Sequence, residues 1–193
     1  MAPPHETKTL IIASAIAVLK SVGNEGLTMR KVAAEAGISL GNLQYHFRDK
    51  AALLVGLAEH YFGECANLLD GYEHQPKSGP RQEQLHELIL WMLDHVDHLS
   101  DMCRLFREIW ALSTRDEEIH RQLVGYYEIY GKKLSDLIRP LCVNKEAASK
   151  ITSLLLPFFE GYSIAHEALP QKKVETARML TKLAWLVGEE SEL

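Results

Sequence analysis

The stretch GISLGNLQYHFRDKAALL, residues 37–54, decides the fold of this chain. It places an aromatic run, Tyr45 to Phe47, directly before a charged run, Arg48 to Lys50. A fully buried helix would not end in a group of cations, and an ordinary solvated helix would not carry this many aromatic side chains. The stretch therefore indicates a helix end that contacts a surface able to accept both aromatic groups and cations.

The residues before and within this stretch predict two short helices joined by a tight turn. Thr28 stands at an N-cap position, and a helix is expected from there to about Ala36. Gly37 supplies the left-handed conformation that ends a helix in a tight turn, and Ser39 can cap the next helix two residues later. Because so little chain separates the two helices, they must cross steeply. The apolar residues expected to close a small core between them are Val32, Ala33, Ile38, Leu43 and Phe47.

This arrangement is a helix-turn-helix, in which the second helix lies in the major groove of DNA and the first crosses the DNA backbone. Phenol, imidazole and ammonium groups at the end of the second helix can donate hydrogen bonds to phosphate oxygens. Asp49 is expected to cap the next helix, which has Lys50 in its first turn and whose N-terminus would then point toward the DNA backbone. The surface required by the aromatic and cationic run is therefore DNA.

Residues 8–62 resemble the DNA-binding domain of the TetR family of bacterial transcriptional repressors. The matching segments are AIAVLKSVGNEGLTMRKVAAEAGIS (15–39) and GNLQYHFRDKAALL (41–54), in the order and at the spacing of the family. The resemblance implies phosphate contacts from Thr28, Tyr45, His46 and Lys50. It implies that the residues facing the bases are Ser39, Leu40, Gly41, Asn42 and Gln44.

Two residues depart from the pattern of the family. Leu40 stands where a lysine is common, and Gln44 replaces the usual tyrosine in the run that leads to His46. A basic contact is thus lost, and an amide that can bind adenine in bidentate fashion is gained. The resemblance implies the mode of DNA binding, but it leaves the operator sequence open. A helical hairpin of another class of protein could match a short motif by accident, but the match here includes the flanking helices.

The composition suits one large or two small globular domains. The chain has 193 residues, of which 47% are hydrophobic, and its net charge is −5. Residues 1–50 carry six Lys or Arg and four Asp or Glu, whereas the rest of the chain carries 15 and 22. This division indicates a small cationic module on an acidic body. Chance variation in a short window explains it about as well.

The cysteines and the apolar runs favour a cytoplasmic protein, and DNA binding would associate it with the nucleoid. Cys65, Cys103 and Cys142 lie far apart and form no C-x-x-C pair, so neither a disulfide framework nor a thiolate zinc site is indicated. The most apolar run, residues 10–19, is far too short to span a bilayer and lacks the basic lead of a signal peptide.

The whole chain predicts an all-α fold of about nine helices, because no run alternates β-branched and polar residues over the length of a strand. We expect a three-helix DNA-binding domain at 1–50, and a larger ligand-binding and dimerisation domain at 51–193. Pro157 lies inside a strongly apolar pattern and is expected to kink or split its helix. The first helix is expected at about 7–22. The helices after the first three are expected at about 50–71 (the connecting helix), 81–99, 101–113, 116–139, 145–168 and 172–189.

Two C-terminal segments resemble the dimerisation helices of the family. ITSLLLPFFEGYSIAHEAL (151–169) and ARMLTKLAWLVG (177–188) carry more apolar surface than one packing partner needs. A homodimer is therefore expected, which would pair two helix-turn-helix modules on an inverted repeat. The alternative is that both segments are interior helices of a monomer. The residues expected at the interface are Phe158, Tyr162, Leu183 and Leu186.

The central helices are expected to hold a pocket for a small-molecule effector that is largely apolar or aromatic. Aromatic and soft apolar side chains supply the walls, with histidines as polar anchors. At helical spacing, most such residues belong to an ordinary core. The candidate pocket residues are Trp91, Met92, His95, Met102, Phe106, Trp110, Tyr127, Phe159, Tyr162 and His166. No cofactor is expected.

Two other readings of the sequence are weaker. Asp94, His98 and Asp101 share one helical face and could bind a divalent metal, but charges at this spacing usually form a solvated face, so no metal is expected. No phosphate loop, G-x-S-x-G or H-E-x-x-H motif is present, so an enzyme is not expected. A helical protein-interaction module or a small-ligand enzyme remains an alternative, and neither would bind an inverted repeat with steep salt dependence. The sequence predicts a DNA-binding transcriptional regulator, and the resemblance implies a repressor released by its effector. The effector, the operator, the regulated genes and the sign of regulation stay open.

Overall fold

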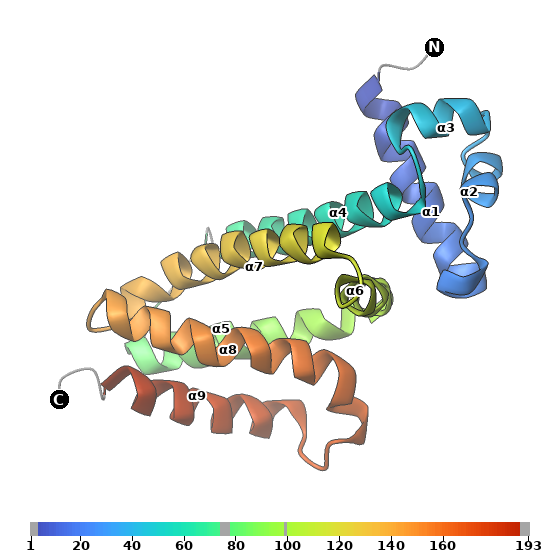
Figure 1. Ribbon diagram of the computed structural model, residues 1–193. Coiled ribbons are helices and arrows are strands. Elements are labelled where there is room, and N and C mark those ends of the chain that lie inside the picture. The colour runs from blue at the N-terminus through green and yellow to red at the C-terminus, as the bar shows by residue number, and fades with distance from the viewer. Residues whose placement is uncertain (1–3, 74–77, 99, 190–193) are drawn as a thin grey trace. The chain divides into compact units, whose positions relative to one another are not determined.

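The computed structural model describes residues 4–73, 78–98 and 100–189, and in these ranges it contains nine α-helices, two 3₁₀ turns and no strand (Figure 1). The all-α class expected from the sequence is confirmed. Within the same ranges, no helix combines the length and apolar character that a membrane span requires. The helices are α1 (Pro4–Gly26), α2 (Met29–Glu35), α3 (Leu40–His46), α4 (Lys50–Glu73), α5 (Arg81–His98), α6 (Ser100–Ser113), α7 (Glu117–Ile138), α8 (Lys145–Ala165) and α9 (Lys173–Glu189), and the 3₁₀ turns are η1 (Arg139–Leu141) and η2 (His166–Ala168).

The contacts between residues divide the chain into two compact units. Unit 1 joins the chain up to Glu64 with Arg104–Tyr126, and unit 2 joins Cys65–Cys103 with Tyr127 and the residues after it. Unit 1 thus adds the first part of α4 and portions of α6 and α7 to the N-terminal helices. The functional boundary expected near residue 50 stays a prediction.

Unit 1 is built around the helix-turn-helix. Its first helix is regular up to Gly23, whose φ of 67° breaks the helix where the sequence predicted its end. The core between the first four helices contains Ile11, Ala15, Leu27, Val32, Leu43, Phe47, Leu53 and Leu57, all buried. Of the five residues expected to close the small core of the motif, Ile38 is only half-buried. The tight packing here depends on side chains that are close in the sequence.

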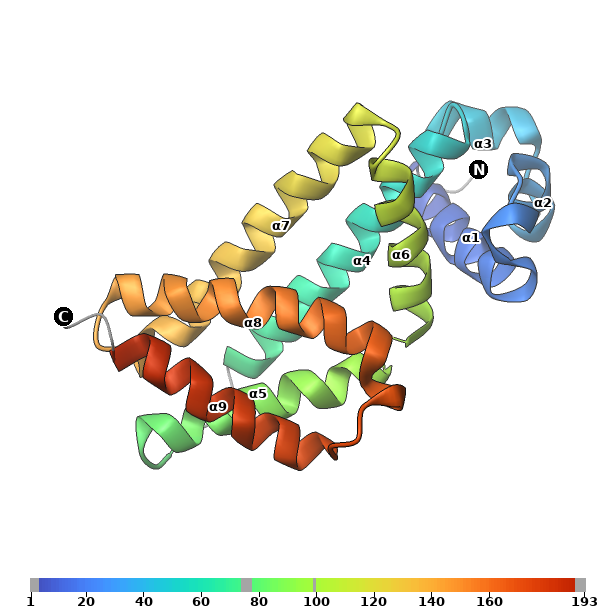
Figure 2. The ribbon, with the colours of Figure 1, turned by 60° about the horizontal axis from the view of Figure 1, so that its bottom comes forward.

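Unit 2 contains the larger apolar core. Helices α5, α8 and α9 lie side by side and contact one another (Figure 2). Fully buried residues from several helices meet there: Leu88, Ile89 and Leu93 from α5, Leu134 and Ile138 from α7, Leu155 from α8 and Ala184 from α9.

Of the two outcomes expected at Pro157, a kinked helix or a split one, the split is wrong, because α8 continues through this residue to Ala165. The kink stays a prediction. Proline has no N–H to donate to the carbonyl of Ser153, four residues earlier. Both Pro157 and Ser153 are exposed, so water can satisfy that carbonyl and the helix persists.

Candidate nucleic-acid interface

Two hydroxyl caps build the helix-turn-helix. The Thr28 hydroxyl accepts a hydrogen bond from the backbone N–H of Lys31 at 3.3 Å, and the Ser39 hydroxyl accepts one from the N–H of Asn42 at 3.1 Å. Gly37, between the two helices, has a φ of 64°. Both predicted caps and the left-handed glycine are therefore confirmed. Each cap satisfies an amide that would otherwise lack a partner, and so fixes where α2 and α3 begin.

The aromatic run at the end of α3 divides into an inner and an outer part. Phe47 is buried, and its ring packs directly against the backbone of Gly56. A Cβ atom added to Gly56 would lie 2.5 Å from a carbon of that ring, so only glycine leaves room for it. Tyr45, in contrast, is 82% exposed, and its ring meets the imidazole of His46 edge to face at 5.2 Å. Phe47 therefore anchors α3 on α4, while Tyr45 is available to a partner molecule.

The polar residues of α3 occupy one face of the helix. Gly41, Asn42 and Gln44 are exposed together with Tyr45, whereas Leu43 is completely buried. At about 100° per residue, the four exposed positions span one side of the helix and Leu43 lies at the centre of the opposite side. The structure thus brings most of the expected base-facing residues onto one exposed face. Leu40, at the start of the helix, is half-buried.

The turn between α3 and α4 places charge at the beginning of α4. Asp49 accepts a hydrogen bond from the N–H of Ala52 at 2.8 Å, which confirms the cap expected there. The N–H of Ala52 and the Arg48 guanidinium, whose Nε lies 2.9 Å from the carboxylate, hold the pKa of Asp49 below its usual value. Lys50 follows in the first turn and is half-buried. Arg48 was absent from the expected phosphate contacts, although its side chain is 87% exposed.

The phosphate candidates lie at helix ends. Thr28 precedes α2, Tyr45 and His46 end α3, and Lys50 begins α4. Thr28 is exposed and His46 is half-buried. At the starts of α2 and α4, backbone amides of the first turn are available to a phosphate, whereas Tyr45 and His46 offer donor side chains at the end of α3.

The candidate pocket residues fall into two groups, one in each unit. In unit 1, Phe106 is buried against Tyr61 and Phe62, with ring centroids 5.2 and 5.3 Å away, whereas Trp110 is 55% exposed. The side chain of Met102 lies outside the described residues. In unit 2, Met92, Phe159 and Tyr162 are buried, and Trp91, His95, Tyr127 and His166 are half-buried.

The two candidate histidines, His95 and His166, are each hydrogen-bonded to the backbone carbonyl four residues earlier. His95 Nδ1 donates to the carbonyl of Trp91 at 2.8 Å, and His166 Nδ1 donates to the carbonyl of Tyr162 at 3.0 Å. Their rings also lie against aromatic neighbours, Trp91 at 4.1 Å and Tyr162 at 5.4 Å. In each histidine, these contacts occupy Nδ1 with a hydrogen bond and hold the imidazole ring in one orientation.

Glu160 is a candidate that the sequence analysis missed. It lies on α8 and accepts a hydrogen bond from the phenol of Tyr127 on α7. Burial raises the pKa of this carboxyl to about 7, and the hydrogen bond from Tyr127 opposes the rise. One turn away, α7 approaches α8 closely where Gly131 faces Leu156. The signal in the sequence is a single acid directly after the apolar run LLLPFF.

The expected interface residues also differ in exposure. Leu183 and Leu186 are 47% and 57% exposed, and with Met179 they form an apolar stripe at i, i+4 and i+7 on α9. Tyr162 is buried within unit 2 and Phe158 is half-buried. An exposed stripe of this kind indicates a contact with another molecule.

The residues considered for a metal site have other contacts or are not described. Asp94 forms an ion pair with Lys173, with the two charged atoms 2.8 Å apart. The side chains of His98 and Asp101 lie outside the described residues. In the part of the chain that the structure describes, no three potential metal ligands come together.

Comparison with known proteins adds to this geometry. Residues 11–57 match the family described as "Bacterial regulatory proteins, tetR family". An uncharacterised HTH-type transcriptional regulator from the dhlA 5′ region of Xanthobacter autotrophicus is 37% identical over 175 residues, which cover 90% of this chain and 86% of that protein. The class A tetracycline repressor of transposon 1721 from Escherichia coli is 44% identical over 54 residues, 28% of this chain and 25% of the repressor.

The fold has relatives among solved structures. A TetR-family regulator described as putative from Mesorhizobium loti MAFF303099 matches with a TM-score of 0.70 at 18% identity, and the match covers 97% of each chain. At this identity the likeness shows the fold alone, but the Xanthobacter protein matches most of the sequence. The chain is a DNA-binding transcriptional regulator and belongs to the tetR family of bacterial regulatory proteins.

Proposed function

We propose that this regulator is a repressor that binds an inverted-repeat operator as a homodimer and leaves it when a small molecule binds to its C-terminal helices. The observation that carries the proposal is the exposed polar face of α3, which capping hydrogen bonds and the buried Leu43 hold in place. Such a face, on the second helix of a helix-turn-helix, suits the major groove.

Within this proposal the contacts with DNA divide into two kinds. Asn42 and Gln44 face base edges, where a glutamine amide can bind adenine in bidentate fashion. Tyr45, His46 and Lys50 bind phosphates, as does Thr28 before α2, and the exposed Arg48 joins them. Leu40 offers only apolar contact, for example with a thymine methyl group.

The dimer contact lies on the stripe formed by Met179, Leu183 and Leu186. Three large apolar side chains exposed on one helix would lose contact with water in a two-fold interface. Pairing two subunits places two recognition helices on successive major grooves, roughly 34 Å apart. The two-fold symmetry of the dimer accounts for an inverted repeat as the operator, and this spacing sets the separation of its half-sites.

The effector site lies in unit 2, near Trp91, Tyr127, Phe159 and Glu160. The half-buried rings of Trp91 and Tyr127 and the buried ring of Phe159 supply apolar walls there, and a carboxyl that is hydrogen-bonded to a phenol supplies a polar anchor. The tetracycline repressor, which matches this chain in its DNA-binding part, is named both for repression and for a small molecule. To lower the affinity for the operator about 100-fold, the effector must bind the released state more favourably than the DNA-bound state by about 2.7 kcal/mol. The protein acts in the cytoplasm, where its operator is.

The test is selection of bound duplexes from a random DNA pool, followed by screening for compounds that release the selected duplex. We expect an inverted repeat and an affinity that falls steeply between 50 and 200 mM salt, by on the order of a hundredfold or more. A helical interaction module or an enzyme would select no sequence. If an inverted repeat is selected but every compound fails to release it, DNA binding stands and the effector part of the proposal fails.

A further inference from the structure

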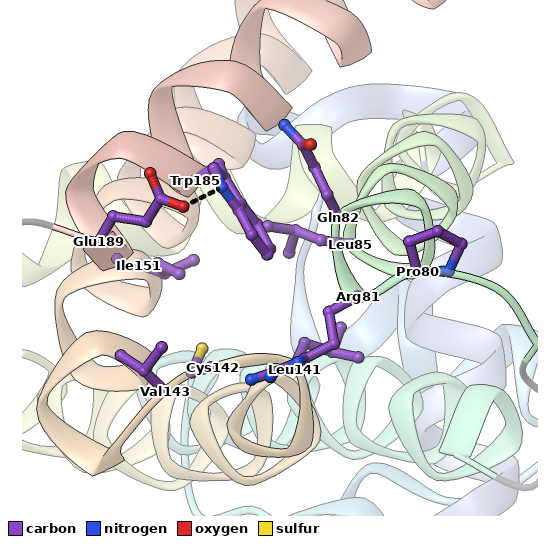
Figure 3. Close-up of a pocket in the computed structure, with 11 residues that line it drawn as sticks. Pro80, Arg81, Gln82, Leu85, Leu141, Cys142, Val143, Ile151, Trp185 and Glu189 are labelled. Carbon is purple, nitrogen blue, oxygen red and sulfur yellow. Dashed lines mark hydrogen bonds between the residues drawn. The ribbon is translucent and has the colours of Figure 1, made fainter.

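Unit 2 contains a cavity at the end where α5 and α8 begin and α9 ends (Figure 3). Its volume is about 400 Å³, within the range of sites that bind small molecules. η1 also borders it, through Leu141. None of the individual residues named above as candidates for DNA contacts, the effector pocket or the dimer interface lines this cavity.

The walls of the cavity are largely apolar. Leu85, Leu141 and Ile151 are buried side chains that line it, and Trp185 adds an aromatic face. The indole N–H of Trp185 donates to the Glu189 carboxylate at 2.7 Å, as Figure 3 shows. This hydrogen bond holds the ring in one orientation, so that its face can pack against the body of a ligand.

Among the described residues, one cation lines the cavity. Arg81, in the first turn of α5, forms no ion pair with any described residue and lies near the half-buried Cys142. Glu189, the acid of the lining, is engaged by the indole of Trp185. A guanidinium without a carboxylate partner among the described residues, next to apolar walls, matches a ligand with a carboxylate at one end and an apolar body.

The cavity is separate from the exposed stripe of α9. Trp185 and Gly188 line the cavity, whereas Leu183 and Leu186 are exposed. At about 100° per residue, these two pairs lie on nearly opposite sides of the helix. A second subunit that covers the stripe would therefore leave the cavity face of α9 uncovered.

We propose that this cavity binds a small monocarboxylate with an apolar body, as a ligand site additional to the effector site. The carboxylate pairs with the guanidinium of Arg81, and the body lies between the Trp185 ring and the side chains of Leu141 and Ile151. Because α8 and α9 supply part of the walls, occupancy stabilises the arrangement of the helices that carry the dimer stripe.

The first test measures binding of three probes, octanoate, 2-naphthoate and 3-phenylpropanoate, by calorimetry on the full chain without DNA. We expect at least one to bind more tightly than 1 mM, and its neutral amide to bind at least tenfold more weakly. The Arg81→Gln variant should lose tenfold or more for the carboxylate and little for the amide, with an unchanged far-ultraviolet circular dichroism spectrum. Arg115→Gln, which removes an exposed arginine of unit 1, should bind as the original chain does.

The second test locates the ligand through Cys142. In a Cys103→Ser background, iodoacetamide should label Cys142 in preference to the buried Cys65, and the bound carboxylate should slow that labelling severalfold. Arg81→Gln should remove the protection. The proposal is overturned if none of the three probes binds below 1 mM, if Arg81→Gln binds them equally well, or if binding leaves the labelling rate unchanged. None of these readouts uses an operator, so their failure would leave the proposed repressor function intact.

Discussion

The helix-turn-helix and the C-terminal unit differ in how far apart in the sequence their decisive contacts lie. In the first, the caps join residues three apart, as from Ser39 to Asn42. In the second, His86 meets the hydroxyl of Thr181 at 3.0 Å across 95 positions, and Lys173 reaches Asp94 across 79. Local contacts make the DNA-binding part recognisable as a motif, whereas the contacts that hold the C-terminal helices together join residues far apart in the sequence. Changes in the two regions should therefore have different consequences.

The largest effect is expected from Leu183→Glu on the apolar stripe. A charge in the middle of a two-fold interface must be buried without a partner or the interface must open, and opening costs less. Sedimentation should then show a folded monomer, and operator affinity should fall roughly a thousandfold, toward that of a single half-site module. Lys182→Glu, one residue away and already polar, is the control and should stay dimeric. A Leu183→Glu protein that remains a dimer with full operator affinity would move the interface elsewhere.

The next effect concerns Glu160 and stability. Its pKa in the folded chain is about 7 against an ordinary 4.5, so the folded state holds the proton more tightly than the unfolded state does. Stability is then full below about pH 4.5 and is lost as the pH rises through 7, by about 2–3 kcal/mol in all. Urea unfolding at pH 5 and pH 8 should show this loss for the original chain.

Glu160→Gln should abolish most of that pH dependence, because glutamine has no proton to lose. Glu167→Gln, at an exposed position in η2, is the matched control and should retain it. Operator binding at pH 7 should change little in either variant, since neither touches the helix-turn-helix. Equal pH profiles for the original chain and Glu160→Gln would show that the carboxyl titrates as an exposed group does.

The same contrast explains which features could be predicted from the sequence. The caps at Thr28, Ser39 and Asp49 were predicted correctly because each depends on a hydroxyl or carboxylate and an amide three residues later. The positions of helices followed from apolar periodicity and from breaks at glycine and proline. The sequence left open whether Pro157 kinks or splits its helix, because the exposure of the carbonyl that it leaves unpaired depends on the packing of α8.

The candidate pocket was harder to predict because it depends on which helices meet. Phe106 and Trp110 have similar aromatic character in the sequence, yet one is buried and the other is largely exposed. Glu160 was missed because a single acid after an apolar run resembles a solvated helix position until the Tyr127 phenol is placed next to it. Periodicity indicates that a face is apolar, but it does not identify the partner of that face.

A smaller effect is expected from Gln44→Ala, which tests base reading. If the exposed amide binds a base edge, its loss should cost about 1–3 kcal/mol on the selected operator and much less on random DNA. The buried Leu43 at the next position is unchanged, so α3 should remain folded, as circular dichroism can verify. Equal losses on both DNAs would assign Gln44 to the backbone or to folding.

The smallest effect is expected from Lys50→Ala, which separates positioning from reading. Lys50 stands in the first turn of α4, next to the Asp49 cap, where an ammonium group suits a phosphate and not a base edge. Its removal should weaken binding to operator and random DNA by similar factors, because a phosphate contact carries no sequence information. The slope of log affinity against log salt should shrink by about one unit, the contribution of one phosphate contact.

Titrations at four salt concentrations between 50 and 200 mM give this slope, with Lys132→Ala on α7 as the control. Because the Asp49 cap does not involve the lysine side chain, the motif should keep its fold, and the ratio of operator to random affinity should survive. A Lys50→Ala protein with full affinity at every salt concentration would remove this residue from the interface and leave Arg48 as the cation that contacts phosphate there.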